Sequence, residues 1–453
     1  MTGEAVSAVR RQAAGLSRDA EAVVGPLRGY HHETYAFPLP AENPLSARFE
    51  RVKLRSPRPG LLWFDRRCFV SEDRLLLALR GRVGRVPECA EVVENVVLQE
   101  FIPGRTLGAG QPPGQPLSGR HSAQLADLFA ELVSIEPDEL RAECACAPED
   151  RAPDGDSAAF LGRLIHFTEN EVCHKHAALY EPLFRRLRVP GNVLHELKER
   201  AAALRPRPFS LLHGDLHRKN LIVDPAGDLW TIDWELAMIG DPLWDLATHL
   251  HLMRYPPREA RRVGELWRSS VESARPGSST GWEQDLPVLL EFKRVQSVYT
   301  DMMRAALALG PGPGPNWGAM EREARKVGRA LAAAAGPMRL SGIPTPSQIM
   351  SAYAEWFSSV GPATRWPGRD RSPARVSRPA AKPSTAPVVF ARGVGRLVEW
   401  GWRPPRPSPR TCQPARVRVM YAPQRSPCRV QASRRPHIQA PSSSVQRSSP
   451  SRQ

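Results

Sequence analysis

One polar segment, residues 213–245, constrains the fold of this chain more than any other part of the sequence. It begins with HGDLHRKN and continues with two short β-rich runs, LIV and LWTI, on either side of turn-forming residues at 224–228. Two β-rich runs around such a turn predict a hairpin. Because a hairpin brings its two ends together, we expect Asp215, Asn220 and Asp233 to converge on one point.

This convergence would join one candidate base to two oxygen donors of the kind that bind a hard cation such as Mg²⁺. Phosphoryl transfer needs this set, because a base must orient the attacking hydroxyl and a metal ion must hold the nucleotide phosphates. A polar loop with an Asx turn before an ordinary hairpin would explain Asp215 or Asn220 singly. It would not explain the whole set, so we favour the catalytic interpretation.

The same segment resembles the aminoglycoside phosphotransferase and choline kinase-like family, small-molecule relatives of the protein kinases. Motifs of that family read HGDxHxxN, IDW or IDF, and GDPxxDLA; this chain has HGDLHRKN, IDWE and GDPLWDLA in the same order. The resemblance implies an α+β, two-lobed protein-kinase-like fold with a small β-rich N-lobe and a mainly helical C-lobe. It also implies ATP and Mg²⁺ as cofactors.

At the positions that match these motifs, the resemblance implies a role for each polar residue. Asp215 would be the catalytic base, and Asn220 and Asp233 would be the Mg²⁺ ligands. His217 would lie near the path of the phosphate. The residues that would support the loop structurally are His213, Asp241 and Asp245.

A kinase-like fold must also supply a lysine and a partnering glutamate from the N-terminal hundred residues. Lys53 is the only lysine before residue 175, and it stands in a predicted strand, FERVKL. Its ammonium could pair with the α- and β-phosphates of ATP. A helix that opens at Ser71 offers Glu72 as the ion-pair partner of Lys53. Both charges could instead be ordinary surface charges, since helix N-termini favour glutamate in any case.

Residues 25–37 occupy the place of a phosphate-binding loop. Backbone amides from Gly29 to Thr34 could bind phosphate, although an ordinary turn explains the segment equally well. His31 and His32 belong to this region rather than to a metal site. The hinge between the lobes is expected at residues 99–102, including Glu100, where backbone groups would meet adenine.

The basic charge of the chain is concentrated at its C-terminus. The formal net charge is +16, yet residues 361–453 carry 19 Lys or Arg and only two acids, so the rest of the chain is nearly neutral. The same segment holds 16 of the 46 prolines and shows no helical periodicity, which is typical of disorder. We expect three regions: an N-terminal lobe at 1–102, a C-terminal lobe at 103–358 and a disordered basic tail at 359–453.

The expected function is ATP-dependent transfer of the γ-phosphate to a hydroxyl of a small molecule, possible acceptors including aminoglycoside-like antibiotics. The helices after the motif contain both acids and arginines, so their charge does not identify the acceptor. The alternative is a non-catalytic kinase-like scaffold whose tail binds nucleic acid or another anionic partner. No apolar run approaches the length of a membrane span, and seven cysteines are too few for a disulfide scaffold, so we expect a cytoplasmic protein.

Overall fold

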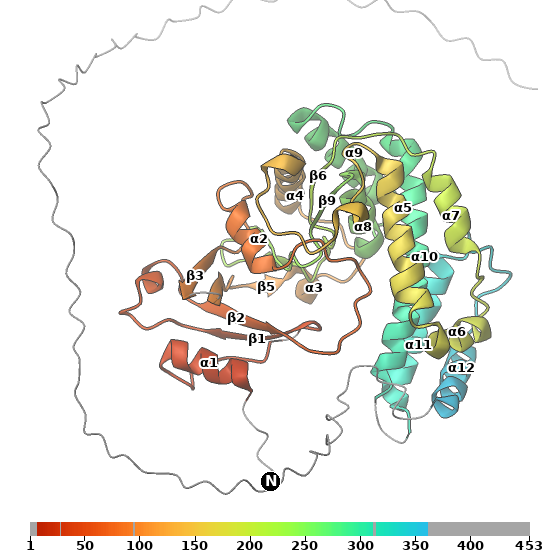
Figure 1. Ribbon diagram of the computed structural model, residues 1–453, viewed down its shortest axis with the longest axis horizontal. Coiled ribbons are helices and arrows are strands. Elements are labelled where there is room, and N and C mark those ends of the chain that lie inside the picture. Colours follow the sequence, from red (N-terminus) through yellow and green to blue (C-terminus); the bar gives the residue numbers. More distant parts are fainter. Residues whose placement is uncertain (1–6, 28, 94–95, 311–313, 361–453) are drawn as a thin grey trace, which may run out of the picture. The chain divides into compact units, whose positions relative to one another are not determined.

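The computed structural model describes residues 7–27, 29–93, 96–310 and 314–360 (Figure 1). All of them belong to one unit, Met1–Val376. The predicted tail, apart from its first two residues, lies outside the described residues.

The N-terminal part is built on a four-stranded antiparallel sheet in the order β1-β2-β4-β3. In Figure 1, helix α1 lies beside β1 and β2. The elements of this part are α1 (Ala8–Ser17), β1 (His32–Phe37), β2 (Val52–Pro57), α2 (Glu72–Leu79), β3 (Cys89–Val93) and β4 (Val96–Glu100).

Strand β2 decides which charges face the interior of the protein. Side chains of a strand alternate between its two faces. Val52 and Leu54 are buried in a small hydrophobic core beneath the sheet. Lys53 and Arg55 therefore share the opposite face, where both line a cavity.

The helix predicted at Ser71 is confirmed as α2. The Ser71 hydroxyl accepts a hydrogen bond from the backbone N–H of Arg74 and so caps the helix. Leu75, Leu76 and Leu79 are buried in the larger hydrophobic core, which α2 shares with the helices that follow.

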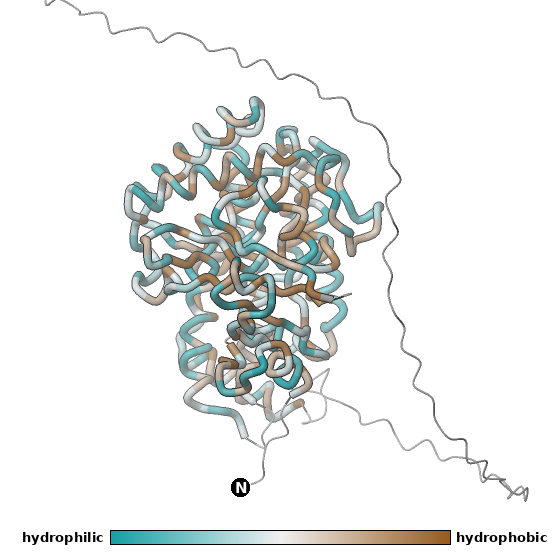
Figure 2. The backbone as a smooth tube through the Cα atoms, turned by 90° about the vertical axis from the view of Figure 1, so that its left-hand side faces the viewer, coloured by the Kyte–Doolittle hydropathy of each residue, from teal (hydrophilic) through white to brown (hydrophobic). Residues whose placement is uncertain are grey.

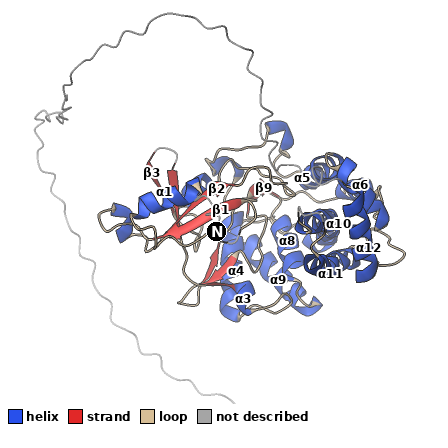
Figure 3. Cartoon of the chain, turned by 90° about the horizontal axis from the view of Figure 1, so that it is seen from below, coloured by secondary structure: helices blue, strands red, loops and turns tan. Residues whose placement is uncertain are grey.

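The larger part is mainly helical. Hydrophilic and hydrophobic residues alternate along these helices (Figure 2), as expected for amphipathic elements. Among the described residues, no helix is long and apolar enough to cross a membrane. The helices are α3 (Leu107–Gly110), α4 (Gly119–Val133), α5 (Ser157–Phe167), α6 (Ala177–Arg186), α7 (Val193–Ala201), α8 (Leu243–Met253), α9 (Pro257–Ala274), α10 (Trp282–Ala308), α11 (Trp317–Ala333) and α12 (Pro346–Ser359). Figure 3 shows α5, α6, α10, α11 and α12 gathered away from the N-terminal strands.

The predicted hairpin is confirmed. Strands β7 (Leu221–Val223) and β8 (Leu229–Thr231) pair antiparallel, and Asp224 closes the turn by accepting the N–H of Asp228 at 2.8 Å. A second ladder joins β6 (Ser210–Leu212), just before the polar segment, to β9 (Met238–Gly240), which follows the hairpin within that segment.

The passage from sheet to helices is fixed at Gly104. Its φ of +135° is unfavourable for a side chain, and an added Cβ would lie 2.3 Å from the carbonyl oxygen of Val223. The close approach lets β5 (Arg105–Thr106) pair with β7. The chain that leaves the sheet is therefore docked directly on the hairpin.

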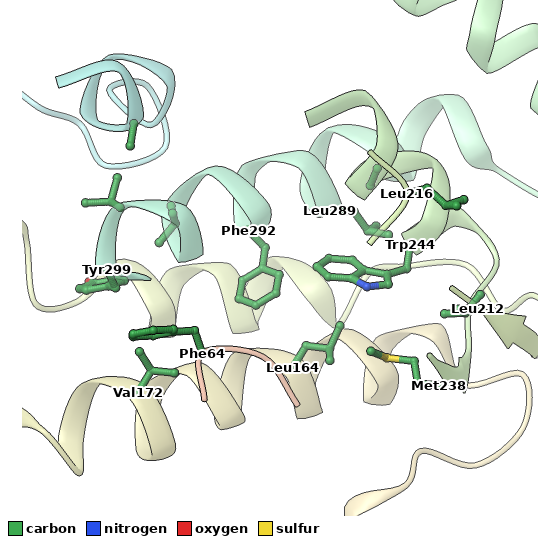
Figure 4. Close-up of a cluster of buried hydrophobic side chains, with 14 of the residues drawn as sticks. Phe64, Leu164, Val172, Leu212, Leu216, Met238, Trp244, Leu289, Phe292 and Tyr299 are labelled. Carbon is green, nitrogen blue, oxygen red and sulfur yellow. The ribbon is translucent and has the colours of Figure 1, made fainter. Parts of the chain in front are cut away.

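The connection between β2 and α2 also reaches the helical part, which the sequence analysis did not predict. Phe64 is fully buried among Leu164, Val172, Phe292 and Tyr299 (Figure 4). The next residue, Asp65, accepts a hydrogen bond from Gln296 on α10 at 3.0 Å. Together these observations confirm the expected α+β fold, a small sheet-containing part joined to a larger helical part.

Candidate active site

The polar loop between β6 and β7 is held from below by helix α8. The carboxylate of Asp245 accepts the backbone N–H groups of His213 at 2.8 Å and of Gly214 at 2.7 Å. Gly214 has φ +79°, and an added Cβ would lie 2.5 Å from the carbonyl oxygen of Leu236. These contacts fix the direction in which the loop enters the site.

His213 is a neutral link between this loop and the end of the hairpin. Its Nδ1 accepts the N–H of Asp215 at 3.2 Å, so Nε2 carries the proton and donates to the carbonyl of Ile232 at 3.2 Å. Burial lowers the pKa of His213 to about 4, against weaker opposing effects of Asp215 and the Ile232 carbonyl. The imidazole is therefore uncharged at neutral pH and has one defined tautomer.

The structure brings Asp215 and Asn220 into direct contact. The amide Nδ2 of Asn220 donates to the carboxylate Oδ2 and to the carbonyl of Asp215, both at 3.0 Å. The Asn220 carbonyl accepts the N–H of Ile232 at 2.9 Å, which places Asp233 directly after the point of contact. The two ends of the hairpin thus converge as its geometry predicts.

The carboxylate of Asp215 is ionised and its direction is fixed. Burial would raise its pKa, but a hydrogen bond from His217 and the charge of that residue outweigh burial and lower the pKa. His217 Nδ1 accepts the N–H of Lys219 at 3.0 Å, so its Nε2 donates to Asp215 Oδ2 at 3.4 Å. His217 therefore contacts the candidate base instead of lining the neighbouring cavity.

Asp233 stands in a concentration of negative charge. Burial, followed by the charges of Glu72, Glu235 and Asp215, raises the pKa of Asp233 to about 8. Its φ is +67°, in the left-handed region that aspartate tolerates better than most residues. A cation placed among these carboxylates would relieve their repulsion.

The donor set fits a magnesium ion on a nucleotide. Since Asn220 directs its amide nitrogen at Asp215, its Oδ1 is left for a cation, and Asp233 offers a second oxygen. Within the residues that the structure describes, no group of three or more His, Cys, Asp or Glu side chains could hold a metal. Mg²⁺ is usually bound by one or two protein side chains, with phosphate oxygens and water as its other ligands.

Glu72 pairs with Arg55, which corrects the predicted pair with Lys53. Arg55 donates to Glu72 Oε2 at 2.6 Å, and Gln99 donates to Oε1 at 3.2 Å. Burial would raise the pKa of Glu72, but the charges of Arg55 and Lys53 outweigh it and lower the pKa. Arg55 is two residues beyond Lys53 on the same strand face, and this period of two is the signal that could have identified it.

Lys53 forms no direct ion pair with any described residue, so no direct partner compensates its charge. Burial lowers its pKa, although Glu72 acts in the opposite sense. An anion at this position would restore the balance, which is the condition expected of a group that binds nucleotide phosphates.

A cavity of about 240 Å³ joins these elements. Its lining includes Gly29, Lys53, Glu72 and Asp233, four of the residues predicted to bind nucleotide or metal. Of the predicted hinge, Phe101 and Ile102 line the cavity, whereas Glu100 is not among the lining residues. The N–H of Glu100 donates to the Glu88 carbonyl in the sheet.

The phosphate-loop region is tied across the cavity to the residue that ends the IDWE motif. His31 Nδ1 lies 2.6 Å from Glu235 Oε1, and His32 Nδ1 lies 3.3 Å from Oε2. His31 also stacks on Trp63, with ring centroids 3.8 Å apart. The sequence analysis placed both histidines in this region but missed Glu235 as their partner.

Asp241 supports the site from further away. It binds the guanidinium of Arg207 through several hydrogen bonds of 2.7 to 3.0 Å, and Arg207 also donates to Asp285 on α10 at 2.7 Å. Arg207 and Asp241 are each 1% exposed. The buried network ties the motif to the helical core.

A small antiparallel sheet joined to a helical part, with the loop of Asp215 and Asn220 between them, defines a two-lobed kinase-like protein. The sequence pattern of the phosphotransferase enzyme family matches residues 28–277, more than half of the chain. The chain therefore belongs to this family.

Several solved structures resemble this chain, whereas no curated protein matches its sequence. A macrolide 2'-phosphotransferase from Brachybacterium faecium is 17% identical, with a TM-score of 0.43, covering 75% of this chain and 100% of its own. An aminoglycoside phosphotransferase mutant bound to ADP and hygromycin B is 14% identical, with a TM-score of 0.43, covering 75% and 100%. A choline kinase from Streptococcus pneumoniae is 16% identical, with a TM-score of 0.38, covering 72% and 98%.

Proposed function

We propose that this protein transfers the γ-phosphate of ATP to a hydroxyl group of a small molecule, with Mg²⁺ on the nucleotide. The observation that carries the proposal is the ionised carboxylate of Asp215, held by Asn220 and His217 beside a cavity that Asp233 lines. The family to which the chain belongs supports a phosphotransferase. ADP in a solved relative supports the choice of nucleotide.

In this proposal, Asp215 orients the acceptor hydroxyl and receives its proton. Asn220 and Asp233 would hold Mg²⁺, which would supply positive charge to neutralise the phosphates. Lys53 supplies the uncompensated positive charge of the cavity, where Gly29 and the hinge also contribute to nucleotide binding. Because the transition state of phosphoryl transfer is largely dissociative, positioning and charge neutralisation contribute more than proton removal.

Hydroxylated antibiotics, including aminoglycosides, belong among the acceptors to be tested. We place the reaction in the cytoplasm, since ATP is available there and the cysteines of the described residues are all free, as in a reducing compartment.

The deciding experiment is a radiolabelled γ-phosphate transfer screen over aminoglycosides, macrolides, nucleosides, choline and amino alcohols. The Asp215→Asn variant should bind Mg-ATP nearly as well as the wild type and lose transfer by at least about a thousandfold. Asp150→Asn, a change at an exposed carboxylate, is the matched control and should transfer normally. Wild-type turnover that survives Asp215→Asn would refute the assignment. Nucleotide binding without transfer to any acceptor would favour the scaffold alternative.

A further inference from the structure

A second cavity lies in the helical part, outside the nucleotide cavity. It has a volume of about 510 Å³, within the usual range of small-molecule sites, and helices α8, α9, α10 and α11 form its walls. Part of the lining is apolar and would accommodate a hydrocarbon surface. The apolar residues are Leu250, Ala260, Leu290, Ala330 and Ala333.

The polar lining of this cavity is strongly basic. Arg254, Arg294 and Arg329 reach it from three different parts of the fold: the end of α8, the middle of α10 and the last part of α11. Within the described ranges, none of the three guanidinium groups has a carboxylate partner. The one acidic residue of the lining, Asp301, already lies 3.4 Å from the Lys326 ammonium and 3.8 Å from the Arg304 guanidinium.

His251 lines the same cavity beside two of these arginines. Its Nε2 lies 2.9 Å from the Ser297 hydroxyl, which also lines the cavity. Burial, followed by the charges of Lys293, Arg254 and Arg294, lowers the pKa of His251 to about 3. The imidazole is therefore neutral, and the lining carries three arginines against one aspartate. The excess of arginine suits an anion, because guanidinium groups bind carboxylates and phosphates through paired hydrogen bonds.

The lining of this cavity is linked to the loop that carries the candidate base through a buried histidine, His249. Tyr255 lines the cavity, and the Tyr255 hydroxyl lies 3.2 Å from His249 Nε2. His249 Nδ1 in turn lies 2.9 Å from the carbonyl oxygen of Leu216, the neighbour of Asp215. One buried side chain thus separates the lining residue Tyr255 from the backbone of the candidate catalytic loop.

We propose that this cavity binds the anionic end of the phosphate acceptor, so that the acceptor is a hydroxylated compound with a carboxylate or phosphate group and an apolar portion. The inference rests on the proposed function. The hydroxyl oxygen would form the new bond to the γ-phosphorus, the bond to ADP would break, and the hydroxyl proton would pass to Asp215. A polycationic aminoglycoside would instead meet three like charges, which disfavours that class.

Anion binding is tested first, with inorganic phosphate as the probe. Thermal unfolding is followed with increasing sodium phosphate against sodium chloride of equal ionic strength, with saturating Mg-ADP in the nucleotide cavity. Phosphate should raise the melting temperature of the wild type and of Arg258→Ala, an exposed arginine of α9 outside the lining. The rise should vanish in Arg294→Ala/Arg329→Ala. No phosphate effect on the wild type, or an equal effect on both variants, would overturn the anion site.

The acceptor class is tested by transfer assays on hydroxylated acids, neutral alcohols and cationic amino alcohols of similar size. Turnover should favour the acids, and Arg294→Ala should raise their KM at least about tenfold, with kcat changed less than about twofold. Turnover of cationic acceptors alone would overturn this inference and leave the phosphotransferase intact. Phosphate binding that depends on the arginines, with no transfer to any compound, would instead reject the proposed function and leave an anion-binding site.

Discussion

Arg55 and Glu72 form an ion pair at 2.6 Å in which both side chains are largely buried, 12% and 1% exposed. The pair joins β2 to α2, and it leaves Lys53, on the same strand face, without an ion pair to any described residue. One strand thus carries two cations with different tasks: Arg55 holds the helix, and Lys53 faces the cavity.

Removing Arg55 and removing Lys53 should have different effects on the protein. Arg55→Ala should lower the free energy of unfolding by about 3 to 5 kcal/mol, because it leaves the buried Glu72 carboxylate without its partner. Lys53→Ala should change stability by less than about 1 kcal/mol and raise the KM for ATP at least about tenfold. Urea unfolding and steady-state kinetics measure the two effects. The pair Arg55→Met/Glu72→Met should recover stability, and equal destabilisation by both alanine variants would contradict the division of tasks.

Asp245 should control turnover without touching nucleotide. Burial raises its pKa to about 6, and its two oxygens serve two backbone donors, of His213 and Gly214. Asp245→Asn keeps one acceptor and turns an amide donor towards the other N–H, so the loop should shift. We expect kcat to fall about 10- to 100-fold with the KM for ATP nearly unchanged. A parallel loss of ADP binding in calorimetry would show that the whole site, and not the loop alone, depends on this carboxylate.

Gly104 should tolerate no side chain. Gly104→Ala forces a Cβ to within 2.3 Å of the Val223 carbonyl at φ +135°, so it should cost at least about 2 kcal/mol of stability. The matched control is Gly162→Ala in the middle of α5, where an added Cβ meets nothing within 4 Å. That variant should gain about 0.5 to 1 kcal/mol from helix propensity. Thermal unfolding of both variants is the measurement, and similar melting temperatures would count against a constrained hinge.

Acid should destabilise the protein through His249. Burial lowers the pKa of this imidazole to about 4, against the opposing effect of the hydrogen bond that the imidazole donates to the Leu216 carbonyl. The unfolded chain binds a proton below about pH 6.5 and the folded one only below about pH 4, so unfolding takes up a proton in that window. The contribution of neutral His249 to the free energy of unfolding is complete above pH 6.5. It falls by about 3 kcal/mol on acidification to pH 4.

His249→Gln removes this titration and should reduce the slope of unfolding free energy against pH between 6.5 and 4 by the share of one proton, while the buried His213 and His251 keep theirs. Urea unfolding at several pH values measures the slope. His195→Gln, at an exposed histidine, should follow the wild-type curve. A His249→Gln curve parallel to the wild type would place the acid sensitivity elsewhere.

The parts of the site that could be predicted from sequence are the local ones. Asp215, Asn220 and Asp233 belong to one hairpin, whose turn residues and β-rich runs are adjacent in the chain, so their convergence follows from short-range geometry. The partner of Glu72 was predicted wrongly, because the choice between Lys53 and Arg55 depends on how α2 lies against β2. Glu235 was missed because its partner His31 is 204 residues away in sequence.

The sequence by itself determined the hairpin, the motif residues, the strand that carries Lys53 and the helical character of the larger part, since each depends on the period or spacing of neighbouring residues. Tertiary structure alone decided which charges meet. Three groups of charges come from elements distant along the chain: the Arg55 pair, the two histidines on Glu235 and the three arginines of the basic cavity. Only packing of the hydrophobic cores brings the members of each group together. Contact between distant charges depends on how whole elements pack, and no local pattern of residues encodes that arrangement.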